Sequence, residues 1–244
     1  MKMDGMSVGE RLKNIQSRMN EACVRAGRAP DSVRLLAVSK LQNLEKIREA
    51  IDSGQVFFGE NYVQEAVEKM GQLASFNLQW HFIGRIQSNK AKLLPGNFAL
   101  VHSVDRLNVI EAMSKHTGEV AQDILLQFNV ADEATKAGAE EAELDRMLEF
   151  VIIEKPRLRV CGLMVMPPYT ENPEQVRPYF KRARWKLEKM REGLAGRNGH
   201  PLDQLSMGTS QDFEVAIEEG ATWIRIGADV FGPRPEGPSE RLMT

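Results

Sequence analysis

Cysteines are scarce in this sequence and long apolar runs are absent, and both absences exclude classes of protein. Cys23 and Cys161 are the two cysteines among 244 residues, too few for a disulfide framework or a cysteine metal cluster. The apolar runs are short, such as residues 150–153, whereas a membrane-spanning helix needs about 20 apolar residues. The N-terminal segment MKMDGMSVGERLKN lacks the apolar stretch of a secretory signal. We therefore expect a cytoplasmic protein with reduced thiols and no membrane partner.

An excess of charge of either sign is also missing. Lys and Arg number 32 against 34 Asp and Glu, which gives a formal net charge of −2. Proteins that bind nucleic acid or anionic membranes normally carry a basic patch, so we expect neither partner. The 4 histidines show no metal-ligand spacing, and no metal site is predicted. The sequence also has no P-loop, dinucleotide fingerprint or nucleophile elbow.

Short apolar segments alternate with longer amphipathic segments along the chain. The alternation predicts a helix over residues 7–26 and then eight strands, with helices between them. The predicted strands are residues 33–38, 56–59, 79–83, 98–102, 123–129, 159–165, 204–207 and 222–226. Eight strand–helix units in a chain of this length are typical of a single (β/α)8 TIM barrel. An open, doubly wound sheet is the alternative, although such sheets usually have fewer strands.

The domain organisation follows from the same pattern. No low-complexity linker or change in composition divides the chain, so we expect one domain over residues 1–244. Residues 1–30 would form an N-terminal helical segment packed on the barrel. A Pro/Gly-rich stretch begins at Gly232, and residues 232–244 are predicted to be a tail.

Lys40 stands at the end of the first predicted strand, where a barrel collects its functional groups. The two-residue period of a strand places Leu36, Val38 and Lys40 on one face. If that face lines the barrel, the amine projects from the mouth, and partial desolvation favours the neutral form that makes a Schiff base. A solvated lysine that opens a loop is the alternative, and position alone favours it.

The last two predicted strands end in turns that contain glycine. Arg225 interrupts an apolar strand that ends at Gly227, and Ala228 follows. Residues 206–210 (SMGTS) place hydroxyl groups and a glycine directly before a helix. Backbone amides and hydroxyls in such turns bind phosphate, and TIM barrels often bind phosphate after strands seven and eight. An outward-facing arginine and an ordinary helix cap are the alternatives.

Asn61 ends the second predicted strand, and Gln64 follows three residues later. This spacing resembles a capping box, so Asn61 is predicted to begin the next helix. Because it follows the end of its strand, Asn61 would also line the mouth of the barrel. Asn43 is predicted to cap the helix after the first strand. His81, inside the third strand, is interpreted as a hydrogen-bonded structural residue.

Seven different short segments lie at or near the predicted strand ends. They are LAVSK (36–40), FGENYVQE (58–65), WHFIGRIQSNK (80–90), VDRL (104–107), GLM (162–164), LSMG (205–208) with Ser210, and RIG (225–227) with Phe231 and Gly232. Together and in this order they resemble the pyridoxal phosphate homeostasis protein family (YggS/PROSC-like). The barrel of that family is similar to the N-terminal domain of alanine racemase. The combination is far more specific than any one segment.

The resemblance implies a pyridoxal 5′-phosphate site without assigned catalytic residues, formed by Lys40, Asn61, Ser210, Arg225, Gly227 and Ala228. Lys40 would hold the cofactor as a Schiff base, and Arg225 would face the pyridine nitrogen. The family commonly has a hydroxyl residue where this chain has Ala228. One side-chain donor to the phosphate is then lost while the backbone amide remains, so we expect weaker phosphate retention.

The resemblance also implies a function, namely intracellular pyridoxal phosphate (vitamin B6) and amino-acid homeostasis without established catalysis. Arginine does not readily give up a proton, so it would leave the pyridine nitrogen unprotonated and the ring a poorer electron sink. We therefore expect a binding protein and not an enzyme. Apo-enzymes that depend on pyridoxal phosphate are possible recipients of the cofactor. A closed barrel is compatible with a monomer.

Two enzymatic alternatives remain. A pyridoxal-phosphate-dependent amino-acid racemase needs proton donors or acceptors on both faces of the substrate. In alanine racemase a second domain supplies one of them, whereas this chain is expected to end with the barrel. Tyr62 or Tyr169 would have to substitute. A Schiff-base aldolase that acts on a phosphorylated sugar would use Lys40 without a cofactor and would be colourless.

Overall fold

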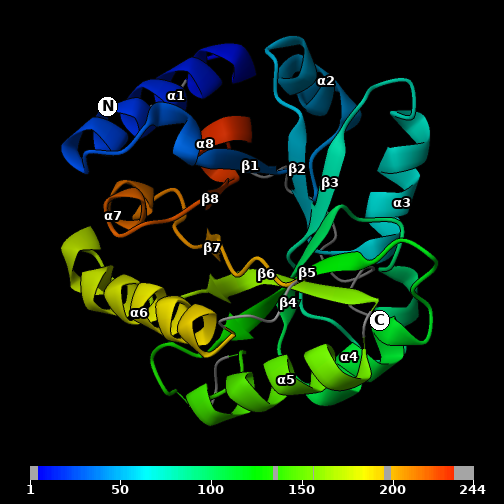
Figure 1. Ribbon diagram of the computed structural model, residues 1–244. Helices are drawn as coiled ribbons and strands as arrows, with labels where there is room; N and C mark the ends of the chain where they lie inside the picture. Colours follow the sequence, from blue (N-terminus) through cyan, green and yellow to red (C-terminus); the bar gives the residue numbers. More distant parts are fainter. Residues whose placement is uncertain (1–4, 134–136, 156, 195–198, 234–244) are drawn as a thin grey trace.

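The computed structural model describes residues 5–133, 137–155, 157–194 and 199–233. Parallel strands pair in chain order and close into a barrel, because β8 pairs with β1 (Figure 1). The strands are β1 Arg34–Val38, β2 Phe57–Glu60, β3 Gln79–Phe82, β4 Leu100–Val104, β5 Gln122–Phe128, β6 Leu158–Val165, β7 Gln204–Ser206 and β8 Trp223–Ile226. The predicted TIM barrel is therefore confirmed, and the open sheet is wrong.

Helices surround the barrel (Figure 1). They are α1 Val8–Arg25, α2 Leu44–Asp52, α3 Val63–Gln72, α4 Leu107–Ser114, α5 Glu141–Glu154, α6 Arg177–Gly193, α7 Phe213–Glu218 and α8 Ala228–Phe231, with 3-10 helices η1 Pro30–Ser32, η2 Ala91–Leu93 and η3 Pro173–Val176. The predicted N-terminal helix is confirmed as α1, which Ser7 and Glu10 begin with a reciprocal capping box. From residue 234 onward, the predicted tail lies outside the described residues.

The predicted caps of two helices have different outcomes. Asn43 does cap α2, because its side-chain oxygen accepts a hydrogen bond from the amide of Lys46 at 3.0 Å. Asn61 does not cap α3. Tyr62 occupies the N-cap position there, and no side chain bonds to the first turn. The predicted capping box of Asn61 and Gln64 is therefore wrong, and the Asn61 side chain is left for another role.

Apolar side chains fill the barrel as well as the space between the barrel and its helices. A separate interior cluster consists of Leu36, Leu100, Leu125, Cys161, Met164 and Trp223, all of them buried. Strands of a parallel barrel are covered on both faces, which is why the predicted strands appear as nearly continuous apolar runs. This packed interior holds the strand ends in place, and the strand ends carry the site.

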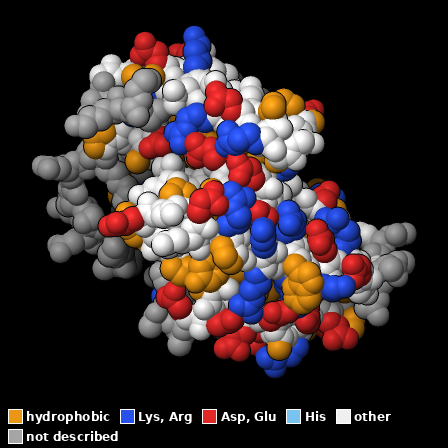
Figure 2. Space-filling view, turned by 90° about the vertical axis from the view of Figure 1, so that its left-hand side faces the viewer, with side chains coloured by type: hydrophobic (Ala, Val, Ile, Leu, Met, Phe, Trp, Pro, Cys, Tyr) orange, Lys and Arg blue, Asp and Glu red, His pale blue; other side chains and the backbone are white. Residues whose placement is uncertain are grey.

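Helix α1 packs against α7 and α8, so the first and last helices lie side by side (Figure 1). Arg28, just after α1, donates to the carbonyl oxygens of Ile217 and Ala221. Arg18 of α1 forms an ion pair with Glu214 of α7 at 2.7 Å. Figure 2 shows basic and acidic side chains interspersed over this face of the molecule. This face therefore carries no patch of a single sign.

Membrane spans and metal clusters were sought in the described ranges. Among these residues, no helix combines the length and the hydropathy that a membrane span requires. No group of three or more His, Cys, Asp or Glu side chains in the same ranges could hold a metal ion. Cys23 and Cys161 are both buried free thiols. Burial raises the pKa of Cys161 to about 12, so its thiol is protonated and unreactive at neutral pH.

Candidate functional site

Lys40 lies at the inner rim of the barrel, just after β1. Leu36 belongs to the interior cluster and pairs in register with Arg225 of β8. Because strand side chains alternate, Val38 continues this inner face and Lys40 follows two residues later. Lys40 is half-buried. The structure therefore places the amine-bearing residue where the sequence predicted it, at the carboxyl end of a barrel strand.

A buried lysine of α3 fastens the turn after β1 to the neighbouring strand and helix. Lys69 Nζ donates to the carbonyl oxygen of Ser39 at 2.6 Å. It also donates to Glu60 Oε1 at 2.8 Å and to Glu65 Oε1 at 2.6 Å. Lys69 and Glu60 are almost inaccessible to water. One ammonium group thus neutralises part of the charge of two carboxylates in a region of low dielectric constant.

Both neighbours of Lys40 are bound to this charged cluster. The Ser39 hydroxyl donates to Glu60 Oε1 at 2.7 Å, and the Leu41 amide donates to Glu65 Oε1 at 2.6 Å. Leu41 has a left-handed backbone conformation, with φ of 60°. Such a conformation is costly for a leucine unless the surroundings hold it. The cluster therefore fixes the backbone on each side of Lys40.

The pKa of Glu60 is raised to about 7, because burial penalises its charged form. The charge of Lys69 opposes this shift, and the charge of Glu65 adds to it. Proton uptake by Glu60 relieves the repulsion between the two carboxylates that share one ammonium. Glu60 is therefore a buried group that titrates close to neutral pH, directly beneath the turn that carries Lys40.

Wild-type stability is expected to fall, relative to Glu60→Gln, as the pH rises through 7. The pKa in the folded protein, about 7, lies above the usual value of 4.5, so the folded state holds the proton more tightly than the unfolded chain. This contribution is complete below about pH 4.5 and is lost above about pH 7. Urea unfolding of both proteins between about pH 5 and pH 8 should show a relative loss of about 2 kcal/mol. A difference that does not vary with pH would contradict this expectation.

Arg225 lies inside the barrel and not on its outer face, so the outward-facing alternative is wrong. Its side chain donates to Ser206 Oγ at 2.8 Å and to the carbonyl oxygen of Val165 at 3.0 Å. Burial lowers the pKa of Arg225 to about 10, so it stays charged at neutral pH. No carboxylate of the described chain pairs with it, although buried charges are normally paired. The guanidinium also has more N–H donors than these two bonds use.

Ser206 continues this polar chain to two buried histidines. His102 Nδ1 lies 2.8 Å from Ser206 Oγ, and His102 Nε2 lies 3.0 Å from His81 Nδ1. Burial lowers the pKa of both histidines well below neutrality, so both rings are uncharged. Because a neutral imidazole donates from one ring nitrogen and accepts at the other, the two bonds of His102 run in one direction, either from Ser206 to His81 or from His81 to Ser206. His81 is thus a hydrogen-bonded structural residue, as predicted.

The turns after β7 and β8 are joined at the rim. The Arg225 amide donates to the carbonyl oxygen of Gly208 at 3.0 Å. Gly208 has φ of 93°, and a Cβ there would clash with α7, so this turn requires glycine. Gly227 lies against β1, because a Cβ there would be 3.3 Å from the carbonyl oxygen of Val38. The two turns therefore reach the part of the rim that carries Lys40.

Donors of the turn after β7 are partly used within the turn itself. The amide and the hydroxyl of Thr209 donate to Asp212 Oδ1 at 2.6 and 3.0 Å. This arrangement keeps the turn open until α7 begins at Phe213. Ser210 is half-buried, and Ala228 is exposed at the start of α8. Ser210 and backbone amides are therefore the donors that this rim would offer to an anion.

Asn61 follows β2 at the same level as Lys40. Gly59 pairs in register with Val38, so the residues two positions later on each strand lie at neighbouring places on the rim. Asn61 Oδ1 is buried without a hydrogen-bond partner among the described residues. Gly84 lets the end of β3 approach, since a Cβ there would be 2.1 Å from the Asn61 carbonyl oxygen. A buried amide oxygen without a partner is costly, and a bound ligand would satisfy it.

Lys69 and Glu60 were not predicted from the sequence as part of the site. A signal for Lys69 was present, because Val63, Ala66 and Lys69 follow one another at three-residue spacing and all three are buried. A lysine on the apolar face of an amphipathic helix indicates a buried partner. Glu60 offered a weaker signal, as an acid that directly continues an apolar strand.

This geometry can be compared with known proteins along nearly the whole chain. The family described as "Alanine racemase, N-terminal domain" matches residues 11–235. A protein of Aquifex aeolicus, named pyridoxal phosphate homeostasis protein, is 46% identical over 231 residues, or 94% of this chain and 99% of that protein. The chain belongs to the pyridoxal phosphate homeostasis protein family. The resemblance found from the sequence segments is thereby confirmed.

Solved structures separate close relatives of this family from distant ones. PipY of Synechococcus elongatus, solved with pyridoxal phosphate bound, is 34% identical and superimposes with a TM-score of 0.80. The match covers 93% of this chain and 100% of PipY. Alanine racemase of Bacillus anthracis is 16% identical, with a TM-score of 0.63, and the match covers 58% of that enzyme. The likeness to this alanine racemase therefore shows a shared fold.

Proposed function

We propose that this protein binds pyridoxal 5′-phosphate and serves in intracellular vitamin B6 and amino-acid homeostasis, without a catalytic reaction of its own. The observation that carries the proposal is Arg225. It is a charged guanidinium buried in the barrel, with unused donors and no carboxylate partner among the described residues, at the end that carries Lys40. The name of the Aquifex relative and the cofactor bound to PipY support the same conclusion.

The residues present fit this cofactor. Arg225 offers N–H donors to a ring nitrogen, and the orphaned oxygen of Asn61 marks a place for a ligand beside Lys40. Ser210 and the turns at Gly208 and Gly227 offer donors of the kind that bind phosphate. Lys40 would hold the cofactor covalently, as an imine formed from its amine and the aldehyde with release of water.

When bound, pyridoxal phosphate supplies an aldehyde and a ring that withdraws electrons. Arg225 limits that second property. Even with its pKa lowered to about 10, the guanidinium donates a hydrogen bond and keeps its proton at neutral pH. Ser206 and the two histidines behind it hold the guanidinium in place. This arrangement favours retention of the cofactor over chemistry at an amino-acid substrate.

The test is the visible absorption spectrum of the purified protein after incubation with pyridoxal phosphate. Reduction with borohydride, followed by peptide mapping, locates the modified residue. A yellow protein with the pyridoxyl group on Lys40 is expected. A protein that stays colourless and unmodified would overturn both the assignment of Lys40 and the proposed function.

Replacing Ala228 by threonine is expected to strengthen retention of the cofactor. Ala228 is exposed at the start of α8, so a hydroxyl fits there without repacking and adds one donor to a phosphate dianion. A gain of about threefold to tenfold in affinity corresponds to about 1 kcal/mol. Equilibrium dialysis measures it. Ala99→Ser, also exposed but before β4 and hence at the other end of the barrel, is the control and should change nothing.

An amino-acid racemase is the alternative function. Tyr62 and Tyr169 are the tyrosines considered for the second proton transfer, and Tyr169 is 72% exposed. An exposed phenol is poorly placed to act in a water-excluded site. Incubation with D- and L-alanine distinguishes the racemase from the binding protein, because turnover well above that of free pyridoxal phosphate would favour the racemase.

The remaining parts of the proposal concern location and partners. We place the protein in the cytoplasm as a monomer that passes the cofactor to pyridoxal-phosphate-dependent apo-enzymes. Its two buried, unpaired cysteines suit a reducing compartment. Light scattering tests the monomer. Activation of an apo-enzyme by the loaded protein, at a rate above that of release into buffer, tests the transfer.

A further inference from the structure

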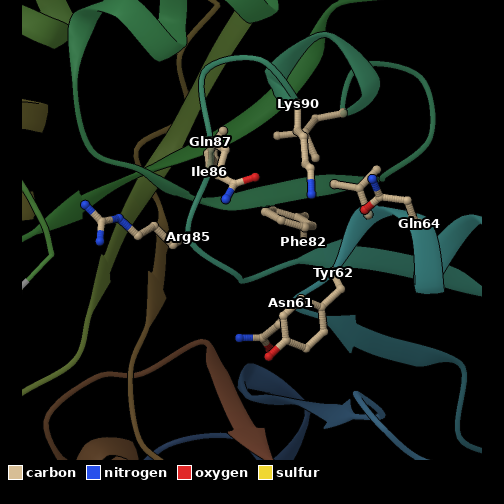
Figure 3. Close-up of a pocket in the computed structure, with 10 residues that line it drawn as sticks. Asn61, Tyr62, Gln64, Phe82, Arg85, Ile86, Gln87 and Lys90 are labelled. Carbon is tan, nitrogen blue, oxygen red and sulfur yellow. The ribbon is translucent and has the colours of Figure 1, made fainter. Parts of the chain in front are cut away.

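A cavity of about 460 Å³ lies beside the proposed cofactor site (Figure 3). It opens between the start of α3 and the segment that links β3 to β4. Its volume is within the range of small-molecule pockets. Phe82, Ile86 and Leu94 lie at its base and are almost fully buried, whereas Tyr62 is a half-buried aromatic residue of its lining. Asn61 belongs to its lining, so the cavity adjoins the rim that carries Lys40.

Lys90 supplies the charge of this cavity. Figure 3 shows its amine directed into the cavity above Phe82, whereas Arg85 extends away. No acidic side chain lines the cavity, and Lys90 has no ion pair within the described ranges. An ammonium group that faces a partly apolar cavity without a counter-ion attracts an anion more strongly than one in water.

Two side-chain amides accompany Lys90. Gln64 and Gln87 lie on either side of its amine in Figure 3, with Tyr62 below. Neither glutamine amide is hydrogen-bonded to another residue of the described chain. An ammonium group together with an amide N–H matches the two oxygens of a carboxylate. A phosphate dianion is better matched by several cations, and of the two described cations in the lining, Arg85 and Lys90, Arg85 extends away from the cavity.

We propose that this cavity binds a small organic monocarboxylate, with the carboxylate on Lys90 and the apolar body against the ring of Tyr62. Through Asn61 the ligand would lie next to the proposed cofactor without reacting with it. The proposal goes beyond cofactor binding and does not depend on the role of Lys40.

The first experiment compares ligands that differ in charge. Isothermal titration of the full chain uses 3-phenylpropanoate, which has no amine and therefore cannot condense with an aldehyde. The neutral alcohol 3-phenylpropan-1-ol and the dianion 3-phenylpropyl phosphate serve as comparisons. The carboxylate is expected to bind at least about tenfold more tightly than the alcohol, as one charge-assisted contact would give. No binding of the carboxylate, or tighter binding of the alcohol or the phosphate, would overturn the proposal.

The second experiment uses matched lysine variants. Lys90→Met should weaken 3-phenylpropanoate at least about tenfold, whereas Lys92→Met, two residues later and exposed, should stay within about twofold of wild type. Circular dichroism confirms that both variants are folded. Equal affinity of the Lys90 variant and wild type would contradict the proposal that Lys90 binds the carboxylate. These titrations use protein without pyridoxal phosphate, so failure of the cofactor assignment leaves this test intact.

Discussion

Lys40→Arg is expected to abolish the visible absorption of the cofactor-loaded protein. Arginine keeps the positive charge, but its guanidinium does not lose a proton at neutral pH and therefore does not condense with an aldehyde. Arg225 and the turns after β7 and β8 remain in the variant, so weak, non-covalent binding should persist. We expect retention of pyridoxal phosphate to fall by at least about 100-fold, or about 2.8 kcal/mol. Absorption spectra and equilibrium dialysis measure both effects.

Lys13→Arg is the matched control for this experiment. Lys13 is an exposed residue of α1, so the same chemical change there should leave colour and affinity unaltered. Peptide mapping after borohydride reduction adds a second readout. A Lys40→Arg protein that remains yellow, with the pyridoxyl group on another lysine, would contradict the proposal that Lys40 holds the cofactor.

Lys69→Met is expected to reduce the free energy of unfolding by about 3–5 kcal/mol. The variant leaves Glu60 and Glu65 buried without their ammonium partner, whose nitrogen lies 2.8 and 2.6 Å from their oxygens. It also removes the hydrogen bond to Ser39, so the turn at Lys40 loses part of its support. Retention of pyridoxal phosphate should therefore fall together with stability. Urea unfolding and equilibrium dialysis, both on the full chain, measure the two losses.

Lys186→Met provides a matched comparison. Lys186 is 4% exposed and Lys69 is 6% exposed, so both lysines are equally buried. The partners of Lys186, Asp145 and Glu141, have side chains that are 59% and 36% exposed, and both are rehydrated when the lysine is lost. We expect a loss of about 1 kcal/mol or less for Lys186→Met and unchanged cofactor retention. Equal losses for the two variants would contradict the special role of the Lys69 cluster.

The stability that Lys69→Met is expected to lose is attributed to the two carboxylates that lose their ammonium partner. A further variant tests this cause separately. Adding Glu60→Gln and Glu65→Gln to Lys69→Met removes the uncompensated charges. The triple variant should recover part of the lost stability, because an uncharged cluster no longer requires burial of unpaired charge. It should not recover cofactor retention, since the turn at Ser39 still lacks its donor. Recovery of both would mean that Lys69 acts through stability alone.

Periodicity and strand ends were enough to predict the barrel and the places of the proposed ligand residues. Parallel strands buried on both faces leave apolar runs that are easy to recognise, and in a barrel their carboxyl ends meet on one rim. Lys40, Asn61 and Gly227 follow such runs directly, so their positions on the rim followed from chain order. Arg225 was more ambiguous, because sequence alone does not tell which face of a strand is the inner one.

Other features depend on contacts between distant segments and could not be predicted. The spacing of Asn61 and Gln64 satisfied a local capping rule, yet the chain begins α3 at Tyr62 and leaves the asparagine oxygen unpaired. Local propensity was overruled by the strand end, which holds Asn61 against Gly84. The charged cluster at Lys69 joins β1, β2 and α3, so it exists only in the folded barrel. The direction of the Lys90 side chain likewise depends on the conformation of the segment that links β3 to β4.

Packing of α1 on α7 and α8 has a consequence for synthesis. The buried face of α1, with Ile15 and Met19 at its centre, leaves the ribosome before the strands of the barrel. Part of the surface that covers it belongs to α7 and α8, which emerge after β7, and β8 closes the barrel onto β1 at the same late stage. A nascent chain without these elements would expose an apolar helix and two open strand edges. Chaperone binding to stalled chains should therefore persist through β7 and end once α8 has been released.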